Sequence, residues 1–261
     1  MSVIRPLLEA RGINRCFGGL KAVQDVSIEI AEGSITALIG PNGAGKTTFF
    51  NTVSMLIPPD SGSIRYHGAG EALELTRLAP HRIARAGVAR TFQNIRLFTG
   101  LSVLDNVKAG LHARTRAGLM AALFGSGEEQ RIAAAALRYL AFVGLLEKAH
   151  TSAISLAYGE RRKLEIARAL AAGPKLLLLD EPAAGMNPQE TDALMDLIRL
   201  IRDSGVTVFL IEHDMKLVMR ASDHIYVMDH GELIAAGPPA AIRRDARVIE
   251  AYLGPGHGEA G

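Results

Sequence analysis

The chain has 261 residues, 48% of them hydrophobic and 21% charged, and its 29 Lys and Arg against 27 Asp and Glu give a formal net charge of +2. This balance excludes the strongly basic surface of a typical nucleic-acid binder, so we expect no nucleic-acid partner. No apolar run reaches the ~18 residues needed to cross a bilayer, and the N-terminus lacks the features of a signal peptide. We therefore expect a chain that is soluble by itself and reaches a membrane only through a partner. The lone Cys16 excludes an internal disulfide and is expected to be a small buried apolar residue.

Two β-strands are predicted near the N-terminus, at residues 7–13 and 22–30, because apolar and polar residues alternate in the second of them. Between them, Phe17 precedes a Gly-Gly turn. Its ring can offer a face to an adenine base, and ordinary core packing is the alternative.

The next stretch matches the pattern G-x-x-x-x-G-K-[ST] at every fixed position. It consists of Gly40, Pro41, Asn42, Gly43, Ala44, Gly45, Lys46, Thr47 and Thr48. Such a loop binds phosphate: its glycines let backbone N–H groups converge on an anion, Lys46 is aimed at the β- and γ-phosphates, and the Thr47 hydroxyl is placed to hold Mg²⁺. A buried strand at 34–39 and a helix at 47–56, stopped by the two following prolines, supply the required context. The sequence therefore predicts binding of a nucleoside triphosphate.

Shorter elements follow the loop. Residues 60–62 are predicted to form a turn, 63–67 a strand, 80–86 a helix and 88–92 another strand. The last strand ends at Gln93, whose flexible amide can reach a metal or a water. Taken alone, a surface glutamine is the simpler interpretation of this residue.

Residues 101–150 differ in character from the rest. Helical periodicity predicts helices at 101–107 and 133–146. The apolar face of the second helix is expected to consist of Ala136, Leu137, Leu140, Val143 and Leu146. Between the two helices, residues 114–127 mix basic and apolar side chains. We interpret them as an exposed insertion that either docks on a partner or covers the neighbouring helices.

A short glycine-containing motif precedes the next predicted helix, which runs to residue 170. The motif consists of Leu156, Ala157, Tyr158, Gly159 and Glu160. The first turns of the helix carry three cations, Arg161, Arg162 and Lys163, which oppose the helix dipole. This placement is reasonable if the helix start faces an anion, and a solvated basic face is the alternative.

An apolar run at 175–179 ends in Asp180 and Glu181 and is predicted to be a central parallel strand. Ligands bind at the carboxyl edge of such strands. There Asp180 can hold Mg²⁺ directly or through water, and Glu181 can orient or deprotonate an attacking water. A second buried strand at 206–211 leads to His213, which can donate a hydrogen bond to a γ-phosphate. For His213 alone, a structural role is the simpler interpretation.

The C-terminal third contains clear local signals. Asn187 as N-cap and Glu190 at the third helical position predict that a helix begins between the strand at 175–179 and the strand at 206–211. A hairpin is predicted at 225–235, a short helix at 248–253 and a disordered tail at 254–261.

The order of these features resembles the nucleotide-binding subunit of ATP-binding-cassette (ABC) transporters over essentially the whole chain. The resemblance implies an α/β fold with a mixed sheet core, an antiparallel β subdomain and a helical signature subdomain. It implies a single nucleotide-binding domain over residues 1–261. The ATPase core would lie at about 7–95 and 172–240, the helical subdomain at about 96–171, and the C-terminal helix and tail at 241–261.

The resemblance also implies roles for individual residues. The phosphate loop would bind ATP together with Mg²⁺, and Phe17 would stack on the adenine. Gln93 would sense Mg²⁺ and couple to the membrane subunit. Asp180 would be the Mg²⁺-linked acid, Glu181 the catalytic base and His213 the switch histidine. The residues matching the family's signature motif, which would bind the nucleotide of a facing subunit, are Ala157, Tyr158, Gly159 and Glu160 after Leu156.

Two departures from the family pattern are informative. L-A-Y-G-E stands where the family usually has L-S-G-G-Q, which removes a hydroxyl, and Asn187 stands where an Asp is usual. With the closing A-Y-L-G, these departures resemble the ATPases of branched-chain amino-acid importers, in particular the longer of their two ATPases, with an insertion near residues 110–130. The lipopolysaccharide-export ATPase, which lacks that insertion, is the nearest alternative.

Partners and mechanism follow from the same resemblance. Two ATPase subunits would close head to tail on ATP, and Lys46 would take up charge during hydrolysis. The implied partners are two membrane-spanning permease subunits, a second ATPase subunit (a paralogue, or else a copy) and indirectly a substrate-binding protein. They would place the chain on the cytoplasmic face of the inner membrane. An ABC ATPase of repair or translation, a P-loop kinase and a GTPase are the competing classes. The first usually carries two cassettes or a long coiled-coil insertion and a GTPase carries a guanine-reading motif, which this chain lacks, whereas a kinase would not need the signature helix or His213.

Overall fold

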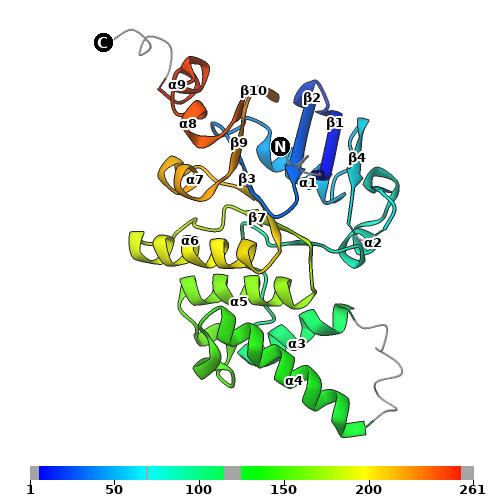
Figure 1. Cartoon of the computed structure of the whole chain (residues 1–261), viewed down its shortest axis with the longest axis vertical. Helices are drawn as coiled ribbons and strands as arrows, with labels where there is room; N and C mark the ends of the chain where they lie inside the picture. The colour runs from blue at the N-terminus through cyan, green and yellow to red at the C-terminus, as the bar shows by residue number, and fades with distance from the viewer. Residues whose placement is uncertain (1–5, 69, 115–124, 254–261) are drawn as a thin grey trace.

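The computed structural model describes residues 6–68, 70–114 and 125–253, which form two sheets and a set of helices (Figure 1). The antiparallel sheet has the spatial order β2-β1-β4-β5. It contains β1 (Pro6–Phe17), β2 (Leu20–Ala31), β4 (Ser61–Tyr66) and β5 (Leu73–Glu74). The second sheet has the order β10-β9-β3-β8-β7-β6 and is parallel except for β10. It contains β3 (Ile35–Ile39), β6 (Val88–Arg90), β7 (Leu176–Asp180), β8 (Thr207–Ile211), β9 (His224–Asp229) and β10 (Glu232–Gly237).

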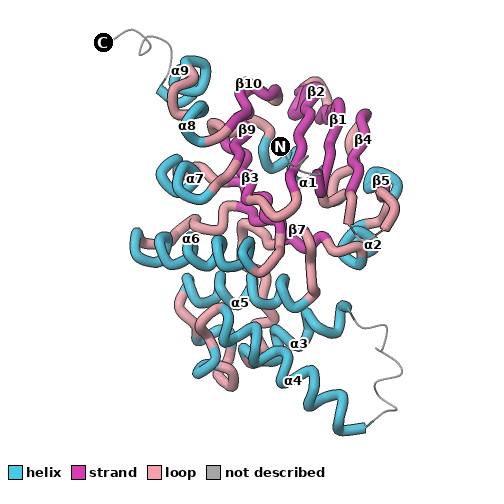
Figure 2. Tube along the Cα trace, viewed as in Figure 1, coloured by secondary structure: helices cyan, strands magenta, loops and turns pink. Residues whose placement is uncertain are grey.

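The helices gather below and beside the second sheet, as Figures 1 and 2 show. They are α1 (Lys46–Val53), α2 (Pro80–Arg85), α3 (Val103–Arg114), α4 (Gly125–Phe142), α5 (Tyr158–Ala171), α6 (Pro188–Asp203), α7 (Met215–Ala221), α8 (Pro239–Ile242) and α9 (Ala246–Leu253). Short 3-10 turns lie at Leu75–Arg77, Leu146–Lys148 and Ala153–Ser155. In the described ranges no helix has both the length and the apolar composition to cross a bilayer.

The parallel sheet has a hydrophobic cluster on each face because successive strand residues point to opposite sides. In β7, Leu177 and Leu179 contribute to the cluster with α3 to α7, whereas Leu176 and Leu178 contribute to the cluster between the two sheets. All four leucines are fully buried. This two-sided burial explains why the strand is a continuous apolar run rather than an alternating one.

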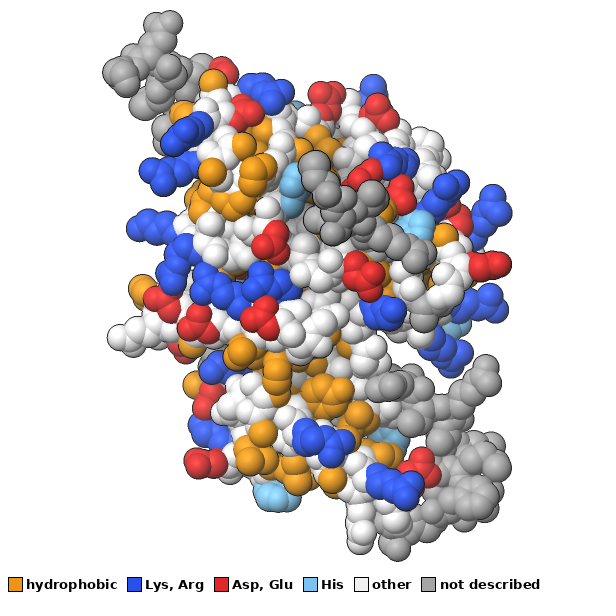
Figure 3. Space-filling model, viewed as in Figure 1, with side chains coloured by type: hydrophobic (Ala, Val, Ile, Leu, Met, Phe, Trp, Pro, Cys, Tyr) orange, Lys and Arg blue, Asp and Glu red, His pale blue; other side chains and the backbone are white. Residues whose placement is uncertain are grey.

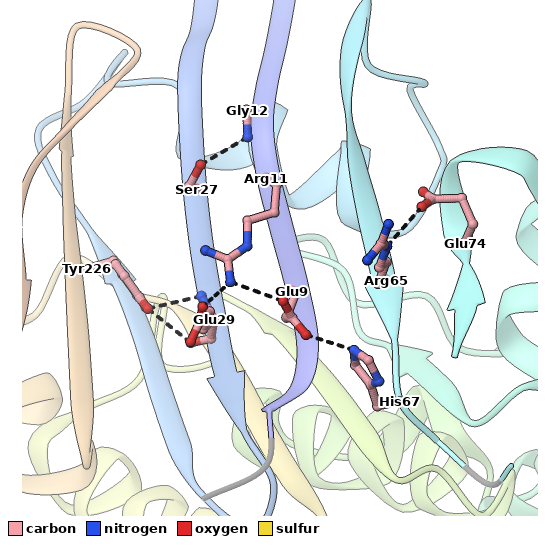
Figure 4. Close-up of polar contacts among 9 residues, drawn as sticks. All are labelled: Glu9, Arg11, Gly12, Ser27, Glu29, Arg65, His67, Glu74 and Tyr226. Carbon is pink, nitrogen blue, oxygen red and sulfur yellow. Dashed lines mark hydrogen bonds and ion pairs between the residues drawn. The ribbon is translucent and has the colours of Figure 1, made fainter. Parts of the chain in front are cut away.

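One tyrosine links the two sheets. The Tyr226 hydroxyl on β9 accepts the N–H of Glu29 and donates to its carbonyl, both at 3.0 Å (Figure 4). On β1, Arg11 ion-pairs with the Glu29 side chain and, at 3.1 Å, with Glu9. The Tyr226 hydrogen bonds thus attach the sheet that carries Phe17 to the sheet that carries the phosphate loop.

Helix α3 continues to Arg114 rather than ending at residue 107, and β6 ends at Arg90 rather than at residue 92. Three further predicted boundaries are wrong for local reasons. Helix α1 ends at Val53 rather than near residue 56, because the Ser54 hydroxyl donates back to the Phe50 carbonyl at 3.0 Å and Met55 has a left-handed φ of 52°. Residues 61–62 belong to β4 instead of a turn. Glycine at position 62 allows this, because a Cβ there would lie 2.5 Å from the carbonyl oxygen of Gly12 on β1.

The predicted helix at 133–146 also ends early. Helix α4 begins at Gly125 and ends at Phe142, and Gly144 follows with a φ of 74°. The change of direction leaves Leu146 48% exposed, whereas Leu140 and Val143 are buried as predicted. In the view of Figure 3, hydrophobic side chains are visible on the surface of this lower, helical part.

Other predictions lie outside the described residues or fail on a single side chain. Most of the insertion expected at 114–127 and the tail at 254–261 are not described. Cys16 is exposed rather than buried, because it lies near the end of β1, where its N–H donates to Asp60 at 2.7 Å. Helices α7 and α8 were not predicted.

Candidate nucleotide site

The phosphate loop lies between β3 and α1, pressed against two other strands. Gly40 has a φ of 150°, and a Cβ on it would lie 2.0 Å from the Met228 carbonyl oxygen at β9. Gly45 has a φ of 97°, and its Cβ would lie 2.1 Å from the Ala22 carbonyl oxygen on β2. Both positions therefore require glycine, through conformation and through close approach. No side chain caps the start of α1 at Gly45, so its first amides and the positive end of the helix face the loop.

Lys46 is folded over the loop that carries it. Its Nζ donates to the carbonyl oxygens of Gly40 at 2.7 Å and Pro41 at 2.8 Å. Burial lowers the pKa of Lys46, and the charge of Glu181 opposes that shift. A cation held this way over the phosphate loop, with Glu181 nearby, is well placed to meet an anion of the size of a phosphate.

A cavity of about 350 Å³ opens over the loop. Its lining comprises Phe17, Leu20, Lys21, Ala22, Asn42, Gly43, Ala44, Gly45, Lys46, Thr47, Thr48, Glu181, His230 and Gly231. Phe17 is 42% exposed, and the Arg15 guanidinium lies 4.9 Å from the centre of its ring. Phe17 is thus a partly exposed ring at the cavity, not a core residue, which leaves adenine stacking as a prediction.

Three predicted residues from separate strand ends meet beside this cavity. Strands β6, β7 and β8 are adjacent and parallel, so the residues after them share one sheet edge. Gln93 Nε2 donates to Glu181 Oε2 at 2.9 Å, and His213 Nδ1 lies 3.9 Å from the same oxygen. Glu181 has a φ of 44°, a left-handed conformation that is uncommon for a residue with a Cβ.

The residues of the signature motif lie elsewhere. Ala157, Tyr158, Gly159 and Glu160 form the start of α5, and none of them is among the residues that line the cavity. The Glu160 carboxylate accepts the N–H of Ala157 at 3.1 Å, which stabilises this helix start. A Cβ on Gly159 would lie 2.8 Å from the Glu190 side chain at the start of α6. One chain therefore does not bring its signature residues to its own phosphate loop.

Comparison with known proteins decides the family. The family model described as ABC transporter matches residues 23–184, more than half of the chain. The chain belongs to the ABC transporter family. A second model, described as branched-chain amino acid ATP-binding cassette transporter, matches residues 232–255. Membership makes the chain an ABC ATPase, in which ATP hydrolysis is coupled to transport.

The similarity to known proteins covers nearly the whole chain. The high-affinity branched-chain amino acid transport ATP-binding protein BraF of Pseudomonas aeruginosa is 47% identical and covers 96% of this chain and 98% of its own. The lipopolysaccharide export system ATP-binding protein LptB of Escherichia coli strain K12 is 36% identical over 95% and 97%. A solved ATP-binding cassette in its ADP conformation has a TM-score of 0.83 and 30% identity, covering 96% of this chain and 99% of that one. The predicted ABC ATPase fold is confirmed.

The site of this ABC subunit also contains an ion pair that the sequence analysis did not predict. Arg90 on β6 donates to the Asp180 carboxylate at 2.7 Å, with only 8% and 5% of the two side chains exposed. Arg90 also donates to the Ser54 hydroxyl at 2.7 Å and lies over the Phe50 ring. The sequence did contain a signal for this pair, because Arg90 lies in a predicted strand and a buried charge needs an opposite charge such as Asp180 nearby.

A second missed carboxylate follows β8. Glu212 is fully buried and accepts the N–H groups of Ala183 at 2.8 Å and His213 at 3.1 Å. Burial raises the pKa of Glu212, and the nearby Glu181 adds to that shift. Glu212 thus joins the loop after Glu181 to the strand end that carries His213. Its position between an apolar strand and His213 was a usable signal, because a buried acid needs donors.

Arg162, at the basic start of α5, neither faces a bound anion nor lies on a solvated basic face, which were the two predicted interpretations. This side chain is 0% exposed, so it is not part of a solvated face, and its hydrogen-bond partners are backbone carbonyls and a glutamate rather than a bound anion. Arg161, in contrast, is partly exposed and donates to the carbonyls of Leu156 and Ile154. The positive charge of Arg162 is therefore balanced by carbonyl dipoles and a carboxylate of the same chain, not by a bound anion.

Proposed function

We propose that this chain is the ATP-hydrolysing motor subunit of an importer for branched-chain or related amino acids. The observation that carries the proposal is the meeting of Gln93, Glu181 and His213 beside a phosphate loop whose Lys46 is buried and poised for an anion. The substrate class is supported by the 47% identity to a branched-chain amino acid transport protein, against 36% for the lipopolysaccharide export protein. The second family model, over residues 232–255, supports the same branch.

The residues fit ATP with Mg²⁺. Thr47 lines the cavity at the start of α1, and Asp180 is buried at the end of β7. In the described ranges no group of three or more His, Cys, Asp and Glu side chains is placed to hold a metal. That suits Mg²⁺, which is commonly held by one or two protein ligands together with substrate phosphates and water. Bound there, Mg²⁺ would offset negative charge on the phosphates.

Each residue of the site would have its own role in ATP hydrolysis. Lys46 would hold the terminal phosphates, Glu181 would take a proton from the attacking water, and His213 would orient the γ-phosphate. Gln93, already bonded to Glu181, would report the state of the site. We retain Phe17 as the adenine-stacking residue, and the signature residues at the start of α5 as contacts to the nucleotide of a facing subunit.

Partners follow from a groove near Gln93. An apolar hollow of about 560 Å³ lies between the ends of α1, α2 and β6 on one side and α3 and α5 on the other. Leu56, Ile83, Phe92, Leu97 and Phe98 are among its lining residues, and Phe98 is 53% exposed. We propose that a helix of one permease subunit docks here. That would place the chain peripherally on the cytoplasmic face of the inner membrane, with residues 96–171 as the helical subdomain.

Two variants test the ATPase. Glu181→Gln should retain ATP binding and lose turnover, and Lys46→Ala should weaken ATP binding and lose turnover. Glu32→Gln, in the exposed turn before β3, is the matched control and should behave as the parent. Steady-state hydrolysis and ATP titration measure both properties. Normal hydrolysis by Glu181→Gln in the assembled complex would refute its assignment as the base.

A pull-down tests the transport assignment. Tagged Glu181→Gln with MgATP is used to capture partners from detergent-solubilised membranes, and mass spectrometry identifies them. Two very hydrophobic subunits and a second, shorter ATPase are expected. Capture of ribosomal or DNA-repair proteins without a membrane subunit would overturn the transport assignment and leave the ATP site intact.

A further inference from the structure

Arg15, near the end of β1, packs its guanidinium over the ring of Phe17. The guanidinium carbon lies 4.9 Å from the centre of the ring. Phe17 lines the nucleotide cavity and is 42% exposed, whereas Arg15 is not among the residues that line this cavity. The cation therefore contacts the ring from the side away from the cavity, and the cavity side of the ring stays open.

The segment that follows α1 holds Arg15 in this place. Arg15 Nη1 donates to Asp60 Oδ1 at 2.7 Å and to the Pro58 carbonyl oxygen at 3.2 Å. Asp60 Oδ2 accepts the N–H of Cys16 at 2.7 Å, and the Asp60 N–H donates to the Asn14 carbonyl oxygen at 2.8 Å. Asp60 thus fixes the Arg15 side chain and the main chain on both sides of it. Because α1 begins at the phosphate loop, one continuous segment carries that loop and the anchor of Arg15.

These hydrogen bonds do not use the whole guanidinium. Arg15 Nε is buried and forms no hydrogen bond within the part of the chain that the structure describes. Only 23% of the Arg15 side chain is exposed. A cation that is partly withdrawn from water is attracted to the negative face of an aromatic ring. Phe17 therefore supplies a contact to Arg15 that Asp60 and Pro58 do not.

The contact has two consequences for a base that stacks on Phe17. Ordering a free side chain during binding weakens affinity by roughly 2- to 12-fold, and Arg15 restricts this ring before any ligand arrives. A cation behind the ring also reduces the negative charge on its faces, which opposes close stacking of a second ring. We propose that Arg15 is a positioning residue for adenine, which orders and polarises the Phe17 ring from behind. This inference rests on the proposed function, in which Phe17 stacks on the adenine of ATP.

Two ligands separate a role at the base from a role in folding. Isothermal titration calorimetry of the full chain uses a non-hydrolysable ATP analogue and inorganic tripolyphosphate, each with Mg²⁺. Arg15→Met should weaken binding of the analogue by roughly 2- to 12-fold and leave tripolyphosphate binding unchanged, because tripolyphosphate has no base. Arg15→Lys keeps a cation and should recover part of the loss. Arg65→Met, at an exposed arginine on β4 of the same sheet, is the matched control and should bind both ligands as the parent does.

A double variant tests whether Arg15 acts through the ring. Phe17→Ala should itself weaken binding of the analogue, and adding Arg15→Met to it should have no further effect. The chain contains no tryptophan, so Phe17→Trp places a single fluorophore at this position. Its emission should change with the analogue and stay constant with tripolyphosphate. In the Arg15→Met background, the change should require a higher concentration of the analogue.

The outcomes distinguish this inference from the function on which it rests. Unchanged binding of the analogue by Arg15→Met, an equal loss for both ligands, or a further loss on the Phe17→Ala background would overturn the role of Arg15 alone. A parent chain that does not bind the analogue would refute the proposed nucleotide site, and Phe17→Ala with parental affinity would refute stacking on Phe17; either result removes this inference as well. If Arg15→Met does not fold, Asp60→Asn replaces it, because it removes the ion pair with Arg15 and should show the same selective loss.

Discussion

Asp180 and Arg90 are two opposite charges buried together at the end of β7. Removing one partner of such a pair leaves the other without compensation, which costs about 3–5 kcal/mol. We therefore expect Arg90→Met to lower the free energy of unfolding by about that amount, as measured by urea denaturation. The double variant Arg90→Met with Asp180→Asn should recover a large part of the loss, because no charge remains buried. Equal losses in the single and double variants would contradict this account.

Glu212 makes stability depend on pH. Its pKa in the folded protein is raised from the ordinary value of 4.5 because the carboxyl is buried. As pH rises through 4.5, the unfolded chain releases this proton while the folded protein retains it, so stability falls until the folded pKa is passed. The variant Glu212→Gln has no such group. Its free energy of unfolding should therefore rise relative to wild type as pH increases above about 4.5.

Denaturant titrations over that pH range measure the difference, with the exposed Glu32→Gln as control. A difference between Glu212→Gln and wild type that stays constant with pH would show that burial does not perturb this carboxyl.

Among the elements, α6 has its start determined by local chemistry. Asn187 Oδ1 accepts the N–H of Glu190 at 2.9 Å, and the Glu190 carboxylate accepts the N–H of Asn187 at 3.0 Å. Asn187→Ala should cost about 1 kcal/mol of stability, since an N-cap acceptor is lost. Asn187→Asp keeps the acceptor and adds negative charge at a helix start, so it should be neutral or stabilising by about 0.3–1 kcal/mol.

Thermal unfolding of the two Asn187 variants checks the prediction. An equal loss for Ala and Asp at this position would mean that the reciprocal cap does not stabilise α6.

Elements whose signals are local were predictable from sequence. The four leucines of β7, the cap of α6 and the phosphate loop each depend on residues close in the chain. The end of α4 was not, because periodicity continues past Phe142 whereas the chain turns at Gly144. The end of α1 was missed because the prolines beyond it are a stronger signal than the Ser54 hydroxyl that ends it.

Side chains with distant partners were the least predictable part of the site. The meeting of Glu181 with Gln93 and His213 follows from the shared edge of parallel strands. Arg162, however, bonds to carbonyls about seventy positions earlier in the chain, and nothing in the local pattern of α5 indicates them. A basic residue near a helix start is ordinarily exposed, so composition alone pointed to solvent or an anion.

At the scale of the whole molecule, the separation of the signature residues from the cavity supports the proposed second ATPase subunit. We expect Glu181→Gln to associate in MgATP, with itself or with the second ATPase, because each cavity would then gain a signature motif. Sedimentation velocity with and without MgATP measures the change in mass. Lys46→Ala is the control and should remain dissociated. A chain that hydrolyses ATP fully while monomeric would refute this proposal.

Glu181 has one further consequence for how this protein can change. Its left-handed backbone disfavours a residue with a Cβ by roughly 1–2 kcal/mol, whereas glycine adopts that conformation freely. A screen that rewards only thermal resistance would therefore tend to replace Glu181, and with it the proposed base. Directed evolution of this protein for stability needs simultaneous selection for turnover, because the position proposed to act as the base is also one that stability alone would not preserve.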